Sequence, residues 1–324
     1  MSIPDIPMID ISRWRNGGIA EREALARRLD AAMQNSGFLM VENHGISGEL
    51  KAAIREAASR FFALAPREKA EIVTTVGGRG WVPPGREANA YYGEVAETGK
   101  ADLKETLTIG RDHSTGDPSV DAEWFAPNVW PAAVPELAEL TAQYTDVCRE
   151  LYFDLLEMCA MALGLEGAYF QRRSAHSPHT LNVNRYPALS VTGAPKEGQF
   201  RVGPHTDWGI LTLLDRQPGY GGLQVQSSDG EWVDAPYAED AFTVNIGDLL
   251  ARWTGDRWRS TRHRVLPPSA EAPDEELISL ILFCETDADT VVAPLPLPVG
   301  GGADYPAVTS ADYLLERAGA ATVK

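Results

Sequence analysis

Two histidines and one aspartate are the residues of this chain that are best suited to binding a catalytic metal. His205 and Asp207 stand two apart within the segment 203–209, and residues two apart on a β-strand point to the same face. A third ligand must come from another strand, and His263 lies 56 residues after Asp207. Two imidazoles and one carboxylate bind a metal from one side and leave the other side open, as in non-heme Fe(II) oxygenases. The pattern predicts a metal site at His205, Asp207 and His263.

The elements that must position these ligands are short β-strands. After about residue 180, β-prone runs alternate with Gly, Pro, Asp and Ser turns. They cover 181–186, 205–214, 222–226, 231–235, 241–246, 260–266, 277–284 and 290–293. Short strands at such close spacing favour a jelly roll or barrel over a β-α-β array. A helix near 311–318 is expected to close the chain.

The chain up to about residue 165 is predicted to be mainly helical. Apolar residues recur at helical spacing in 21–34, 50–63 and 135–163. A short strand is expected at 38–41, and the Gly-, Pro- and charge-rich stretch 77–118 is expected to form loops. The fold class predicted is therefore α+β. Residues 1–165 form a helical region of the same unit, and 166–324 form the catalytic core with its C-terminal helix.

Composition limits the class of partner. The 324 residues are 44% hydrophobic, which is enough for a full core, and the formal net charge is −17. An excess of acidic groups repels phosphate backbones and anionic lipids, so nucleic-acid and membrane binding are not expected. We find neither a signal peptide nor a run of roughly 18 apolar residues. We expect a cytoplasmic protein that acts on a small molecule, and the sequence does not indicate an oligomeric state.

Several motifs, in order along nearly the whole chain, resemble those of the isopenicillin N synthase-like family of Fe(II)/2-oxoglutarate oxygenases. They are 38–46, 102–105, Asn184–Pro187, His205–Gly209, 221–225, 245–248 and His263–Val265. The resemblance implies a double-stranded β-helix (a jelly roll) with the metal at its mouth. It also implies Fe(II) as cofactor, with 2-oxoglutarate and O2 as cosubstrates. The expected reaction is hydroxylation, desaturation or cyclisation of a small molecule with release of succinate and CO2, in a setting such as specialised metabolism.

The resemblance also implies cosubstrate-binding residues, and here the chain departs from the family. Asn184 and Tyr186 match an Asn-x-Tyr-Pro motif whose side chains contact the oxo acid. The family's Arg-x-Ser, which binds the far carboxylate, corresponds to 277–279, where Ser279 is present but leucine replaces the arginine. A desolvated carboxylate without a cation is costly, and a two-pronged guanidinium is the usual partner. Arg201 shares strand parity with His205 and is one candidate substitute.

Other interpretations stay open at this point. The protein could bind 2-oxoglutarate in another pose, accept a different oxo acid, or take all electrons from its substrate, as isopenicillin N synthase does. A metal-binding sensor or an inactive barrel is the non-enzyme alternative. A zinc or manganese hydrolase could use the same ligands, although no glutamate base of the zinc-peptidase kind stands beside them.

Overall fold

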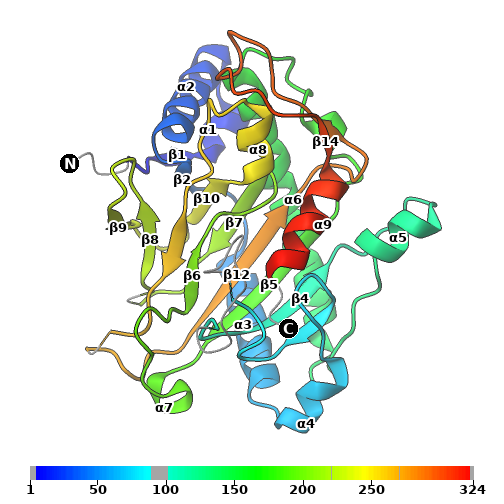
Figure 1. Ribbon diagram of the computed structural model, residues 1–324, viewed down its shortest axis with the longest axis vertical. Helices are drawn as coiled ribbons and strands as arrows, with labels where there is room; N and C mark the ends of the chain where they lie inside the picture. Colours follow the sequence, from blue (N-terminus) through cyan, green and yellow to red (C-terminus); the bar gives the residue numbers. More distant parts are fainter. Residues whose placement is uncertain (1–4, 89–100, 220, 270, 322–324) are drawn as a thin grey trace.

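Two β-sheets enclose the centre of the molecule, and helices cover the outer face of the larger sheet (Figure 1). The computed structural model describes residues 5–88, 101–219, 221–269 and 271–321. The large sheet has the order β1 (Met8–Asp10), β2 (Phe38–Glu42), β10 (Phe242–Ile246), β7 (Leu211–Asp215), β12 (Leu277–Cys284), β5 (His179–Tyr186), β4 (Glu105–Gly110) and β3 (Gly80–Val82). The small sheet has the order β6 (Val202–His205), β11 (His263–Val265), β8 (Leu223–Gln226) and β9 (Trp232–Asp234). Among the described residues, β1 and β2 pair in parallel, and the other strand pairs of these two sheets are antiparallel.

The helices pack mainly on one side of the large sheet. In Figure 1 the long helix α6 (Glu136–Ala162) runs behind that sheet, and it contacts β7, β12, α2 (Ile19–Asn35) and α3 (Gly48–Phe62). Ser47 caps α3, because its hydroxyl accepts hydrogen bonds from the first-turn amides. The other helices are α1 (Ile11–Asn16), α4 (Pro66–Lys69), α5 (Pro118–Trp124), α7 (Leu189–Thr192), α8 (Asp248–Trp253) and α9 (Ser310–Ala321). A small pair, β13 (Val291–Val292) and β14 (Val308–Thr309), precedes α9.

Alternation along the central strands separates a structural face from a cavity face. On β12, Ile278, Leu280 and Leu282 belong to the buried core shared with the helices. Ser279 and Ile281, which alternate with them, line a cavity instead. The period of two along a strand therefore divides the large sheet, with one face packed on the helices and the other turned towards the small sheet.

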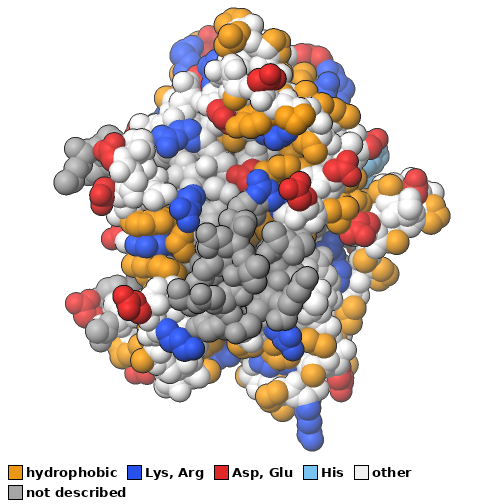
Figure 2. All heavy atoms as spheres, in the orientation of Figure 1, with side chains coloured by type: hydrophobic (Ala, Val, Ile, Leu, Met, Phe, Trp, Pro, Cys, Tyr) orange, Lys and Arg blue, Asp and Glu red, His pale blue; other side chains and the backbone are white. Residues whose placement is uncertain are grey.

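The structure confirms the α+β class, and the main predicted helices lie within one or two residues of their expected bounds as α2, α3 and α6. The run 205–214 is divided into β6 and β7. The expectation of loops throughout 77–118 is wrong, because β3 and β4 extend the large sheet there; residues 89–100 lie outside the described part of the chain. Within the described residues, no helix is long and apolar enough to cross a membrane. Basic and acidic side chains are interspersed on the face drawn in Figure 2.

Candidate active site

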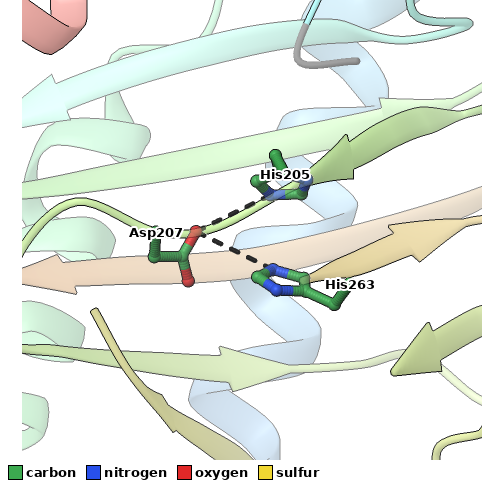
Figure 3. Close-up of side chains that lie close together, drawn as sticks. All are labelled: His205, Asp207 and His263. Atoms are coloured by element: carbon green, nitrogen blue, oxygen red, sulfur yellow. Dashed lines mark ion pairs between the residues drawn. The ribbon is translucent and has the colours of Figure 1, made fainter. Parts of the chain in front are cut away.

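The three predicted metal ligands meet at the end of the small sheet. His205 ends β6, His263 begins β11, and the two residues are direct partners across the ladder. Asp207 follows two residues after His205, and the three side chains point towards one another (Figure 3). Asp207 Oδ1 lies 3.6 Å from His205 Nε2 and 3.8 Å from His263 Nε2. One ligand atom from each residue lies within 4.8 Å of the others, a spacing that suits one shared metal ion.

Backbone carbonyls orient both imidazole rings. His205 Nδ1 lies 2.7 Å from the Gly203 carbonyl oxygen, and His263 Nδ1 lies 3.1 Å from that of Thr261. A carbonyl only accepts hydrogen bonds, so Nδ1 carries the proton in each ring and Nε2 keeps its lone pair. Both lone pairs are thus available to a metal on the side of Asp207, an arrangement typical of metal-binding histidines.

The carboxylate of Asp207 is held on its other oxygen. Oδ2 accepts hydrogen bonds from Thr212 Oγ1 at 2.6 Å and from Asn245 Nδ2 at 2.7 Å. Thr212 lies on β7 and Asn245 on the neighbouring β10, where the two residues are register partners. These two hydrogen bonds fix the carboxylate plane and leave Oδ1 facing the imidazoles.

The protonation states at neutral pH are those that a metal site needs. Burial and the neighbouring His263 lower the pKa of His205 to about 4, so the ring is neutral. Burial alone would raise the pKa of Asp207, but the two histidines and the hydrogen bonds from Asn245 and Thr212 outweigh it, and the pKa lies below its usual value. A neutral imidazole at His205 and an ionised carboxylate at Asp207 can bind a divalent cation without first releasing protons.

A cavity of about 530 Å³ opens beside the three ligands, between the two sheets. Asn184, Tyr186 and Ser279, which the sequence proposed as cosubstrate residues, all line it. Ser279 on β12 is paired with Asn184 on β5, and Leu277 with Tyr186. The Asn184 amide nitrogen lies 3.4 Å from the Tyr186 hydroxyl. The structure thus brings these side chains into one row facing the same cavity as the metal ligands.

Arg201 is not among the residues that line this cavity. Its guanidinium is buried and makes a 2.8 Å ion pair with Glu275, and it lies over the ring of Tyr186. A guanidinium that is already paired with one carboxylate interacts more weakly with a second carboxylate. The role of Arg201 in holding the cosubstrate stays a prediction of the sequence, and its ion pair argues against it.

Sequence reasoning missed Glu285, the first residue after β12. Glu285 lines the cavity, and its Oε2 is buried without a hydrogen-bond partner among the described residues. Burial and the nearby Asp207 raise the pKa of Glu285 to about 8. A Cβ atom on Gly209 would lie 2.2 Å from Glu285 Oε2, so glycine at that position makes the room for the carboxyl group. Strand parity with Ser279 and Ile281 is the signal that could have found it.

Thr212 and Asn245 were also not assigned roles from the sequence. Asn245 stands in a motif that carries the family resemblance, and Thr212 lies in the strand after Asp207. Their contact with Asp207 depends on which strands pair, and β7 and β10 are 27 residues apart in the chain, counted from Asp215 to Phe242.

Two family models match the chain. Residues 6–133 match the one described as non-haem dioxygenase in morphine synthesis N-terminal. Residues 178–286 match the 2OG-Fe(II) oxygenase superfamily, and this range contains all three predicted metal ligands. Together the two ranges cover most of both regions of the chain, with the second centred on the barrel.

Relatives extend the match to nearly the full length. The chain is 42% identical to a validamycin A dioxygenase from Streptomyces hygroscopicus subsp. limoneus, over 96% of this chain and 85% of the relative. It is 31% identical to a homoarginine-6-hydroxylase from Glycine max, over 90% and 88% of the two chains. A solved Neurospora crassa structure in complex with alpha-KG and thymine superposes with a TM-score of 0.83 at 29% identity, covering 97% and 96% of the chains.

These findings decide between the alternatives that the sequence left open. Related structures hold alpha-KG, which is 2-oxoglutarate, and relatives are named dioxygenases and hydroxylases. An oxidase that works without an oxo acid is not favoured, nor is an inactive barrel. This chain belongs to the 2OG-Fe(II) oxygenase superfamily, and it is an oxidoreductase that depends on Fe(II), 2-oxoglutarate and O2.

Proposed function

We propose that His205, Asp207 and His263 hold the Fe(II), and that 2-oxoglutarate enters the adjoining cavity alongside Asn184, Tyr186 and Ser279. The observation that carries this proposal is the convergence of three ligand atoms within 4.8 Å at the edge of a cavity of about 530 Å³. When bound, the iron supplies the oxidising chemistry, in which the oxo acid is converted to succinate and CO2.

The residues of the chain position and protect that chemistry. The carbonyls of Gly203 and Thr261 keep the two imidazoles in the tautomer that presents Nε2. Thr212 and Asn245 keep the Asp207 carboxylate in place. Ser279 can donate its hydroxyl to a cosubstrate oxygen. An enclosed site between two sheets limits access of water to the reacting centre.

The substrate that we propose is a small molecule that combines an apolar part with a hydrogen-bonding group. Ile281, Phe283 and Leu314 give the cavity apolar walls, and Glu285 offers an unpaired carboxyl oxygen close to the metal ligands. A buried polar atom without a partner is costly, and a hydrogen-bonding group on the substrate would satisfy it. Relatives named for validamycin A and homoarginine support a small, polar substrate.

Coupled product formation tests this proposal. The purified protein is incubated with Fe(II), 2-oxoglutarate and air, and with validamycin A, homoarginine or other small polar candidates in turn. We expect succinate and an oxidised candidate to form in equal amounts, with both lost in Asp207→Ala. Oxidation of a candidate at an undiminished rate without any oxo acid, and without succinate, would contradict the proposal.

A further inference from the structure

The end of the cavity that is remote from the metal ligands needs a positive charge when 2-oxoglutarate binds. 2-Oxoglutarate is a dicarboxylate, so the carboxylate remote from the metal becomes buried when the molecule binds. Such a charge costs several kcal/mol unless a cation meets it. On β12, the residue next to Ser279 on the cavity face is Leu277, which packs with Tyr186, Val202 and Val265 and offers no charge. The compensating cation must therefore come from elsewhere.

Among the described residues, three cations line the cavity: Arg79, Lys104 and Arg216. Lys104 already has a carboxylate partner, because its Nζ lies 2.6 Å from Glu87. Burial alone would lower the pKa of Lys104, but Glu87 and Asp102 raise it, as expected of a cation surrounded by acids.

Arg79 lies at the wrong end of the cavity. It packs against Gly110, where a Cβ atom would lie 2.0 Å from its Nε. Gly110 is paired with Thr180, and Thr180 is paired with Phe283, four residues beyond Ser279 on β12. At about 3.3 Å per residue, that separation is roughly 13 Å towards the metal ligands, because Phe283 is also paired with Thr212, the hydrogen-bond partner of Asp207.

Arg216 lies where the charge is needed. The ladder between β7 and β12 ends with Asp215 opposite Leu280, and one further step sets Arg216 beside Ser279. Gln217 holds this segment against β12, because its side-chain oxygen accepts a 2.9 Å hydrogen bond from the Ile278 amide. Arg216 is also four residues from Thr212, the partner of Asp207, and so roughly 13 Å from it along the strand. A 2-oxoglutarate molecule that reached from a metal beside Asp207 to the Arg216 side chain would lie along that distance.

The guanidinium of Arg216 has no carboxylate partner in the described part of the chain. One nitrogen donates to the Pro236 carbonyl, and the group lies 5.3 Å from the centre of the Tyr237 ring. Its Nε is buried and has no hydrogen-bond partner within the described ranges of the chain. Burial lowers the pKa of Arg216 to about 10, so the group remains charged at neutral pH, and no carboxylate of the described residues is paired with it. A half-buried guanidinium that has no carboxylate partner among the described residues, and that lies beside a serine hydroxyl, is suited to bind a carboxylate with two hydrogen bonds.

We propose that Arg216, with Ser279, binds the far carboxylate of 2-oxoglutarate and thereby makes the cavity selective for a dicarboxylic oxo acid. This inference rests on the proposed function, since it requires the oxo acid to lie in this cavity with its other end at the metal.

The test is an anaerobic titration of the Fe(II)-loaded protein, followed by the visible charge-transfer band of the chelated oxo acid. Two ligands are compared: 2-oxoglutarate, and 2-oxopentanoate, which has the same carbon chain but no far carboxylate. We expect the wild type to prefer 2-oxoglutarate strongly. Arg216→Gln should weaken 2-oxoglutarate on the order of 100-fold, as loss of one partner of a buried charge pair does, and leave 2-oxopentanoate nearly unchanged.

Three further variants sharpen the result. Leu277→Arg in the Arg216→Gln background returns a guanidinium to the cavity face beside Ser279, and it should restore much of the affinity for 2-oxoglutarate. Arg201→Gln tests the rival cation, and Arg264→Gln is the matched control, because Arg264 stacks on Phe200 and Trp232 outside the cavity. Both should keep the preference for the dicarboxylate.

The inference is overturned if the wild type binds both oxo acids equally, if Arg216→Gln keeps its affinity for 2-oxoglutarate, or if that variant weakens both ligands alike. A larger loss in Arg201→Gln than in Arg216→Gln would also overturn it. Absence of the band from wild type with either ligand, although Fe(II) binds, is a different failure. It would count against the proposed function itself.

Discussion

Thr212 offers a sensitive test of how the metal ligands are held. Its hydroxyl donates to Asp207 Oδ2 at 2.6 Å in a buried setting, and within the described residues that oxygen accepts one other hydrogen bond, from Asn245. Thr212→Val keeps the shape of the side chain and removes the donor. A hydrogen bond to a charged group contributes about 1.5–3 kcal/mol, and loss of an outer partner of a metal ligand typically costs about 10- to 100-fold in metal affinity. We expect Fe(II) binding to weaken by that factor.

The strand next to β7 provides a matched control. Thr243 lies on β10, two residues before Asn245, and its hydroxyl is buried without a partner among the described residues. Thr243→Val removes a hydroxyl that does nothing for Asp207, so it should leave Fe(II) affinity unchanged. Affinities are measured anaerobically by competition with a coloured chelator. Equal affinities in wild type and Thr212→Val, or an equal loss in Thr243→Val, would refute the reasoning.

Three further predictions concern stability. In the metal-free protein the folded-state pKa of Glu285 is about 8, well above that of an exposed glutamate. Between about pH 4.5 and 8, the folded protein therefore holds a proton on Glu285 that the unfolded chain has lost. For this reason the Glu285 carboxyl lowers the free energy of unfolding increasingly as the pH rises through that range. Glu285→Gln should therefore raise the melting temperature more at pH 8 than at pH 5, and an equal shift at both would contradict this. Asp215 is buried between Lys51 and Arg55. Asp215→Asn should therefore lower the free energy of unfolding by about 3–5 kcal/mol in urea titrations. A loss under about 1 kcal/mol would show that the ion pairs of Asp215 are not desolvated. Fe(II) at about 1,000 times its dissociation constant should stabilise the wild type by about 4 kcal/mol, and the same stabilisation in Asp207→Ala would argue against this site.

Strand parity explains why the metal site could be predicted from the sequence. His205 and Asp207 needed only a period of two, and His263 needed only a second β-prone run that could pair with the first. The structure sets His205 opposite His263. The three main N-terminal helices also follow from local periodicity, because each has one apolar face that packs on the sheet or on another helix.

The parts that could not be predicted depend on which distant strands become neighbours. β4 lies in a charged stretch, and it is a strand because it pairs with β5, more than 60 residues later in the chain. The choice between Arg201 and Arg216 has the same origin. Arg201 was chosen from the sequence because it lies an even number of residues from His205 and would share its strand face, but Arg201 forms an ion pair with Glu275. Arg216 instead faces the cavity, because of the register in which β7 pairs with β12.

The most direct test of the central claim is a spectrum recorded without oxygen. Fe(II) and then 2-oxoglutarate are added to the purified protein, and bound iron is quantified in parallel. We expect a visible charge-transfer band that saturates with one oxo acid per iron, and that is absent in Asp207→Ala at the same protein concentration. A wild-type protein that binds iron but gives no band at any concentration of 2-oxoglutarate, or an Asp207→Ala variant that keeps the band, would contradict the account.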